Sequence, residues 1–259
     1  MKLKWKLFII LLIASILGIL AVLPYSLTLQ GGLPQNLPVP FYVIVLSSVI
    51  QNAVLFAVAI FIGLTLYKKV GLGLPIIEGW LEGKPVKDYL TSILPISIGL
   101  GLAAGILIIG FQYIFSILGI VINAPASQLT PPAWQGLLAS FYGGINEEIL
   151  LRLFIMTLLV WLFFKIKKTD TGKPTKTSFW LAIIIAAILF GAGHLPTVSA
   201  ITTLNLPIVA YVITLNSIGG IIFGWLYWKK GLESAMIAHF SADIILHVIP
   251  AILISTAIL

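Results

Sequence analysis

The sequence predicts an all-α polytopic membrane protein, a transmembrane helical bundle of seven or eight spans. Hydrophobic residues make up 60% of the 259-residue chain and charged residues only 9%, and the mean hydropathy is +1.14. The apolar segments are long and continuous, whereas a transmembrane β-barrel needs segments of roughly ten residues with alternating polarity. No repeat, low-complexity tract or soluble domain separates them, so we expect one integral membrane domain over residues 1–259.

The first three spans are expected at about residues 7–23, 41–67 and 91–120. The first joins a lysine-rich start to an apolar run, and no clear small-residue cleavage site follows, which favours a retained signal-anchor. The second follows a loop rich in Gly, Pro and Asn. Residues 71–90 mix charged and apolar side chains and are expected to lie at the cytoplasmic membrane surface. The third contains Pro95 and several glycines, which permit a kink.

The last four spans are expected at about residues 134–164, 178–194, 206–228 and 233–259. A polar, basic loop separates the fourth span from the fifth, and the fifth is expected to end near Pro196. Seven spans place the amino terminus inside and the carboxyl terminus outside a cell membrane. An eighth span is expected only if one of the long segments is broken.

The lysines indicate this orientation, because all of them fall in alternate loops, as cytoplasmic loops do under the positive-inside rule. The net charge of +7 therefore reports topology and contact with anionic lipid, and not a surface for nucleic acid. The lysines are Lys2, Lys4, Lys6, Lys68, Lys69, Lys84, Lys87, Lys165, Lys167, Lys168, Lys173, Lys176, Lys229 and Lys230.

The fourth predicted span contains two adjacent glutamates, Glu147 and Glu148, and the only arginine, Arg152. Charges within a membrane span are costly and mark functional sites by default. Glu148 and Arg152 are four residues apart on a helix and can pair, whereas Glu147 points about 100° away. An ion pair that fixes helix packing would explain one glutamate and leave Glu147 without a role.

Histidines occur in two further spans. His194 follows a Phe-Gly-Ala-Gly run at the end of the fifth span, where an interfacial histidine is also common. His239 and Asp243 share a face of the seventh span, where the carboxylate can orient the ring or both can bind one metal ion. A buried hydrogen-bonded pair is the alternative. His247 continues the same face and is closer to the outer end, where a purely interfacial role is favoured.

These polar side chains predict a catalytic cavity inside the bundle, because intramembrane charges are tolerated when they converge there. The chain contains no cysteine, no serine-nucleophile elbow and no H-E-x-x-H zinc motif, which leaves a glutamate that acts on water. Depth is a partial test: Glu148 and His194 each lie about 25 Å from the cytoplasmic end of their span, but His239 lies only about 14 Å in. To bring His239 to the depth of Glu148 and His194, the seventh helix would have to begin deeper in the membrane or be tilted.

The motifs E-E-x-x-x-R (Glu147, Glu148, Arg152), F-x-x-x-H (Phe190, His194) and H-x-x-x-[ND] (His239, Asp243) occur in this order. This pattern, over about residues 134–250, resembles the CPBP family of CAAX prenyl proteases and bacteriocin-processing or immunity proteins. The resemblance implies an intramembrane endopeptidase that cleaves prenylated, leader-peptide or membrane-associated substrates, with a cavity open towards the cytosol. Because the depth estimate places the glutamates nearer the outer side, a cytosolic opening would require a deep cavity or a broken fourth span.

By the same resemblance, Glu147 would activate water, Glu148 would pair with Arg152, and His194 would position the water. His239 and Asp243 would stabilise the oxyanion or hold the site together. Eukaryotic relatives often have Asn at the position of Asp243; an ionised Asp cannot donate a hydrogen bond, which favours an orienting or metal-binding role.

A zinc ion held by His194, His239, Glu148 and Asp243 is one way to activate the water, and it is favoured because paired carboxylates at membrane depth are otherwise hard to keep charged. A metal-free glutamate in an apolar cavity is the other. Two further functions stay open: a non-catalytic scaffold or bacteriocin-immunity protein that keeps the same polar centre, and a transporter with a proton relay. The transporter is the weakest, because no inverted repeat is visible.

Overall fold

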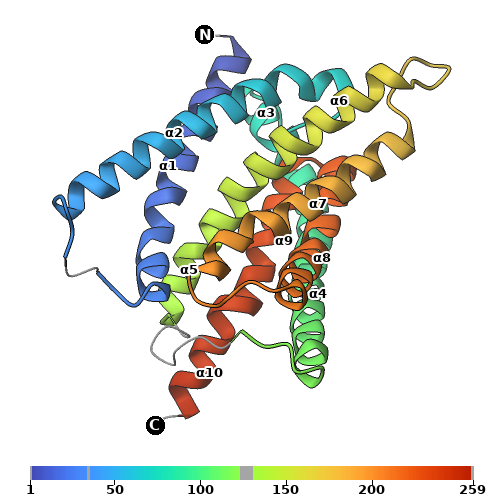
Figure 1. Ribbon diagram of the computed structural model, residues 1–259. Helices are drawn as coiled ribbons and strands as arrows, with labels where there is room; N and C mark the ends of the chain where they lie inside the picture. The colour runs from blue at the N-terminus through green and yellow to red at the C-terminus, as the bar shows by residue number, and fades with distance from the viewer. Residues whose placement is uncertain (1, 34–35, 123–130, 258–259) are drawn as a thin grey trace.

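The computed structural model describes residues 2–33, 36–122 and 131–257, and within them it is helical without a β-strand. Seven helical segments are long and apolar enough to cross a membrane, which confirms the predicted multi-pass helical bundle (Figure 1). The elements are α1 (Leu3–Leu29), α2 (Phe41–Leu66), η1 (Tyr67–Val70), α3 (Pro75–Leu81), α4 (Lys87–Ile117), α5 (Ala133–Phe141), η3 (Tyr142–Glu147), η4 (Ile149–Met156), α6 (Thr157–Ile166), α7 (Lys176–Ser199), α8 (Leu206–Lys230), α9 (Leu232–Asp243), η5 (Ile244–Val248) and α10 (Ile249–Ala257).

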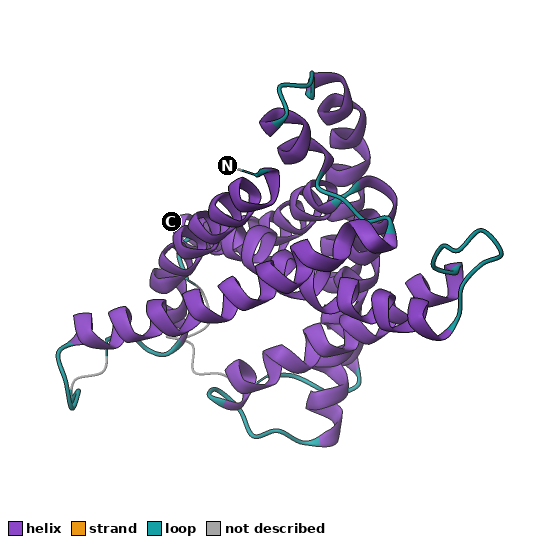
Figure 2. Ribbon diagram, turned by 90° about the horizontal axis from the view of Figure 1, so that it is seen from above, coloured by secondary structure: helices purple, strands orange, loops and turns teal. Residues whose placement is uncertain are grey.

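The fourth span, from α5 to α6, lies between two groups of helices. On one side α4, α8 and α9 pack against one another, and α7 lies along α8. On the other side α1 packs on α5 and η3, and α2 packs on α1 and η4. The first half of α2 leans away from the rest of the bundle, which Figure 1 and the view from above in Figure 2 both show. The fourth span can therefore meet side chains from both groups.

Glycines allow α4 to approach the seventh span closely. A Cβ at Gly101 would lie 2.8 Å from the Cβ of Ser241, and one at Gly105 would lie 2.7 Å from the Cβ of Ile245. Lipid tails are as apolar as leucine, so close contact between small residues favours helix association in a membrane. This packing fixes α9 and the histidine that it carries.

The seventh span begins inside the protein, beneath α3. Gly231 adopts a positive φ of 94°, and the N–H of Leu232 donates to the carbonyl of Gly73 at 3.0 Å. Glu233 Oε1 accepts from the N–H groups of Ile76 and Ile77 at 3.0 and 2.9 Å. Leu232 is fully buried. α3 therefore covers the start of α9, and the depth of His239 in the membrane stays a prediction.

Several span boundaries differ from the sequence-based prediction, and α1, from Leu3 to Leu29, is longer at both ends than the expected span 7–23. α4 begins at Lys87, and α7 continues through Pro196 to Ser199. Proline is tolerated in membrane helices because neighbouring groups satisfy the freed carbonyl. The extra turn of α7 keeps His194 within the helix.

Candidate active site

The two adjacent glutamates face different surroundings in the fourth span. This span is π-helical at η3 and η4, and Glu147 ends η3 while Glu148 precedes η4. The side chain of Glu148 is 0% exposed, and that of Glu147 is 21% exposed. π-helical turns are rare and occur frequently at functional sites. One carboxylate is therefore enclosed by protein, and the other is open to a cavity.

Glu148 forms the centre of a buried charge network. Its Oε1 lies 3.0 Å from Arg152 Nη1 and 2.7 Å from His239 Nδ1. Arg152 also donates from Nη2 to the carbonyl of Gly220 at 3.0 Å, and its guanidinium lies 5.2 and 5.5 Å from the ring centres of Phe190 and Phe223. Because a carboxylate only accepts, His239 donates from Nδ1 to Glu148. This bond fixes the ring and turns Nε2 towards the cavity.

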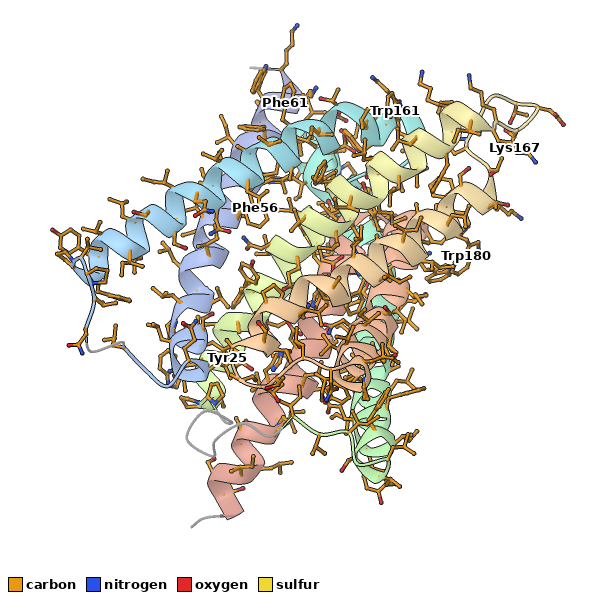
Figure 3. All side chains as sticks on the ribbon, viewed as in Figure 1. Tyr25, Phe56, Phe61, Trp161, Lys167 and Trp180 are labelled. Atoms are coloured by element: carbon orange, nitrogen blue, oxygen red, sulfur yellow. The ribbon has the colours of Figure 1, made fainter. Side chains whose placement is uncertain are left out.

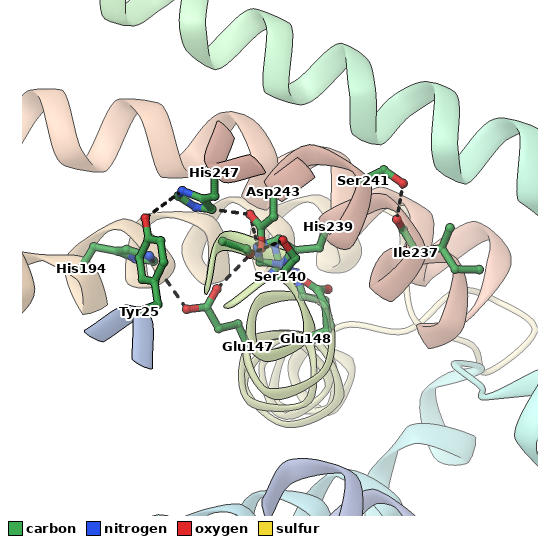
Figure 4. Close-up of polar contacts among 12 residues, drawn as sticks. Tyr25, Ser140, Glu147, Glu148, His194, Ile237, His239, Ser241, Asp243 and His247 are labelled. Carbon is green, nitrogen blue, oxygen red and sulfur yellow. Dashed lines mark hydrogen bonds and ion pairs between the residues drawn. The ribbon is translucent and has the colours of Figure 1, made fainter. Parts of the chain in front are cut away.

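Glu147 lies between the two predicted histidines. Its Oε2 is 3.5 Å from His239 Nε2, and its Oε1 is 3.9 Å from His194 Nε2 (Figure 4). The Nδ1 of His194 lies 2.9 Å from the carbonyl of Phe190, to which it can donate. Both rings therefore present Nε2 to the same carboxylate, at separations where a bridging water is the natural partner.

Asp243 is linked to a residue of the first span. Its Oδ1 lies 3.7 Å from His239 Nε2 and 3.8 Å from His247 Nε2. The hydroxyl of Tyr25, on α1, lies 3.0 Å from His247 Nδ1 (Figure 4). The ring of His247 therefore has partners on α9 and α1, which a purely interfacial role does not require. Tyr25 belongs to no recognised motif, and the sequence analysis did not identify it as a site residue. Its only distinguishing property in the sequence is a hydroxyl group among apolar side chains.

Gly143 allows His239 and Asp243 to lie close to the backbone of the fourth span. A Cβ at this position would collide with Asp243 Oδ2 and would lie 3.1 Å from His239 Nε2. The absence of a side chain on η3 therefore lets α9 bring its histidine and carboxylate against the fourth span. All six predicted catalytic side chains, Glu147, Glu148, Arg152, His194, His239 and Asp243, lie in one connected cluster.

The cluster lies on the wall of a large cavity of about 1110 Å³. Segments of α1, α2, α4, α5, η3, η4, α7, α8, α9 and η5 line it. Glu147, His194, His239, Asp243 and His247 all face this space, and most of the remaining lining is apolar. Its volume reaches the upper end of the range for small-molecule pockets, which suits a chain segment.

The donor geometry does not fit the tentative zinc site. Glu148 faces Nδ1 of His239, whereas Asp243 faces Nε2 of the same ring. One ion binds an imidazole through one nitrogen, so these two carboxylates cannot share an ion with this ring. Among the described residues, no group of three or more His, Asp or Glu side chains has an arrangement that could hold a metal ion.

Comparison with known families gives a match to part of the chain. The family model described as type II CAAX prenyl endopeptidase Rce1-like matches residues 129–245, which carry all three motifs. The resemblance seen in the sequence is confirmed over this segment. Comparison with curated proteins and with solved structures gives no match.

Proposed function

We propose that this protein is an intramembrane endopeptidase whose general base is Glu147, because residues 129–245 match the Rce1-like model of type II CAAX prenyl endopeptidases. The observation that carries this proposal is the position of Glu147: it is open to the cavity and faces Nε2 of both His194 and His239. The other glutamate, Glu148, is enclosed by Arg152 and His239 and has no access to a substrate.

The proposed reaction begins with a water held between Glu147 and His194. Glu147 accepts a proton from this water, and the resulting hydroxide adds to the carbonyl carbon of the peptide bond. The tetrahedral intermediate then collapses, the C–N bond breaks, and Glu147 returns the proton to the leaving amine. One water is consumed, and a carboxylate and an amine are released.

His239 is placed to stabilise the oxyanion. Its Nδ1 is held by Glu148, and its Nε2 faces the cavity beside Glu147 and Asp243. An imidazolium donates Nε2–H to a developing oxyanion, a contribution that is typically worth about 10²–10³-fold in rate. Asp243 and His247 would hold this ring in the required orientation.

The test compares Glu147→Gln with Glu82→Gln, the same chemical change at an ion-paired residue of the loop between α3 and α4. The purified proteins are assayed with a farnesylated carboxyl-terminal peptide and with its unprenylated counterpart. Glu147→Gln should lose about 10²–10⁴-fold in rate, the usual contribution of a general base, with an unchanged unfolding temperature. Activity retained within tenfold would refute Glu147 as the base, and a parent protein that cleaves neither peptide would favour the scaffold function.

The proposed mechanism needs no metal ion, in keeping with the donor geometry around His239. Metal analysis of the purified protein, with activity measured before and after a chelator, tests this. Unchanged cleavage is expected. Loss of cleavage that added zinc restores would show that an ion completes the site.

A further inference from the structure

Asn146, directly before Glu147, is a buried polar side chain that the proposed mechanism does not use. It lies in η3, is 0% exposed, and donates from Nδ2 to the carbonyl of Ser15 on α1 at 2.9 Å. The hydroxyl of Ser15 is turned to its own helix, where it donates to the carbonyl of Leu11. Hydrogen bonds from amide side chains hold neighbouring membrane helices together. The bond from Asn146 therefore fixes η3 against α1.

Gly18 provides the space that the amide of Asn146 occupies. A Cβ at position 18 would collide with Asn146 Oδ1. Gly18 lies three residues after Ser15, so both residues meet the amide on one face of α1. Among the described residues no hydrogen-bond donor reaches Oδ1. The amide is therefore held by its bond to Ser15 and by its fit against Gly18.

Three consecutive polar side chains of the fourth span point in three directions. Successive residues of a helix point about 100° apart, so Asn146 and Glu148 lie on nearly opposite faces and Glu147 lies between them. Asn146 contacts α1, whereas Glu148 contacts His239 on α9. Of the three, only Glu147 lines the cavity. Each neighbour of the proposed base is thus held by a different helix.

The π-helical geometry of η3 makes the direction of Glu147 sensitive to this anchor. A π-turn contains one residue more than an α-turn, so relaxation of η3 to an α-helix would rotate the residues that follow about the axis of the span. Glu147 ends η3 and would turn with them. A misplacement of about 1 Å can lower the rate of an enzyme about 10²-fold.

α1 is held at a second point, which makes it a fixed partner for Asn146. The hydroxyl of Tyr25 lies 3.0 Å from His247 Nδ1. Tyr25 lies about 15 Å further along the helix than Ser15. Figure 3 shows it near the lower end of α1, where this helix packs on α5. Two contacts along its length keep α1 from rolling away from η3.

We infer that Asn146 is a positioning residue that directs Glu147 into the cavity. It touches neither the substrate nor the reacting water, and it acts through the orientation of η3. This inference rests on the proposed function in taking Glu147 as the base. The alternative is a purely structural role, in which loss of Asn146 changes only the stability of the protein.

The first test is cleavage of the farnesylated peptide by Asn146→Ala, Glu147→Gln and the double variant. Asn146→Ala should lower kcat about 10²-fold with an unchanged KM. The double variant should be no slower than Glu147→Gln, because residues that act through one group are strongly non-additive. An Asn146→Ala protein with the kcat of the parent, or losses that multiply in the double variant, would overturn the inference.

Asn205→Ala is the matched control for this substitution. Asn205 caps α8 by accepting from the N–H of Ile208 at 2.9 Å. Loss of this cap should lower the unfolding temperature and leave kcat unchanged. The control therefore separates a loss of stability from a loss of position.

Gly18→Ala tests the same contact from the side of α1. The added methyl group should push Asn146 out of place and lower kcat in the parent protein. It should have no further effect in Asn146→Ala, whose shorter side chain leaves the space free. Gly99→Ala, in open space on α4, is the control and should be silent. Equal losses from Gly18→Ala in both backgrounds would contradict the inference.

A measurement without substrate separates the inference from the proposed function. The chain contains no cysteine, so the thiol of a Glu147→Cys variant reports the direction of that side chain. Its reaction with a small water-soluble methanethiosulfonate in detergent should slow when Asn146→Ala is added. The reaction of Asn216→Cys, on α8 in the lining of the same cavity, should not change.

The outcomes of this labelling are independent of catalysis. Equal labelling of Glu147→Cys with and without Asn146→Ala would overturn the inference, whether or not the protein cleaves peptides. Slowed labelling, together with a Glu147→Gln protein that keeps its cleavage within tenfold, would refute the proposed function and leave the positioning role of Asn146 established.

Discussion

Arg152→Met should destabilise the protein strongly, because it leaves the buried charge of Glu148 without its closest partner. The Arg152–Glu148 separation of 3.0 Å corresponds to an attraction of about 5 kcal/mol at an effective dielectric constant of about 20. Removing one member of a buried pair typically costs about 3–5 kcal/mol, since the other charge remains desolvated. The carbonyl of Gly220 also loses its side-chain donor. At about 2–4 °C per kcal/mol for a chain of this size, the unfolding midpoint should fall by about 10 °C.

The assay is thermal unfolding in detergent, followed by the fluorescence of the seven tryptophans. The double variant Glu148→Gln, Arg152→Met removes both charges and should regain at least half of the lost stability. Matched measurements on Lys68→Met, at a pair whose lysine is 59% exposed, should show little change. An Arg152→Met midpoint within about 3 °C of the parent, or a double variant less stable than either single one, would refute the reasoning.

Tyr25→Phe should lower kcat by several-fold without unfolding the protein, because it removes only the hydroxyl that contacts His247. The control is Tyr113→Phe, at an exposed position on α4. Equal rates for Tyr25→Phe and the parent would contradict this prediction. Gly143→Ala should lower the cleavage rate by about 10²-fold, since the new Cβ would displace Asp243 by an amount that catalysis does not tolerate; Gly110→Ala, in open space, should be silent in the same peptide assay. Asp243→Asn should keep cleavage within about tenfold of the parent and Asp243→Leu should not, because an amide oxygen can still accept from the two rings that Asp243 faces and leucine cannot. Equal losses would show that a polar side chain at this position is not needed.

The sequence was sufficient to predict the bundle, because apolar runs of about twenty residues form membrane helices whatever their neighbours. The spacing of Glu148 and Arg152 was likewise enough for their pairing, since four residues place two side chains on one helix face. Helix ends were less predictable: Pro196 indicated a terminus, but α7 continues to Ser199 because tertiary packing tolerates a proline within a membrane helix.

The remaining features of the site depend on contacts between distant parts of the chain. Tyr25 lies on α1, over two hundred residues before its partner His247, and nothing in its local sequence distinguishes it. The burial of the first residues of α9 depends on the cover that α3 provides over Leu232. The zinc ligands were grouped by residue type, and only the geometry shows that Glu148 faces the wrong nitrogen of the ring.

The shape of the cavity was also beyond the sequence alone, because the parts of each helix that line it are set by the assembled bundle. The outward lean of the first half of α2, visible in Figure 1, carries no signal in an apolar sequence.

The central claim is that Glu147 and His194, on separate spans, activate one water together. Single-turnover cleavage by Glu147→Gln, His194→Ala and the double variant tests it most directly, because residues that act as a unit are strongly non-additive. Each single variant should lose about 10²–10⁴-fold, and the double variant should be no slower than the slower single one. Single losses below tenfold, or losses that multiply in the double variant, would show that the two side chains do not share a water.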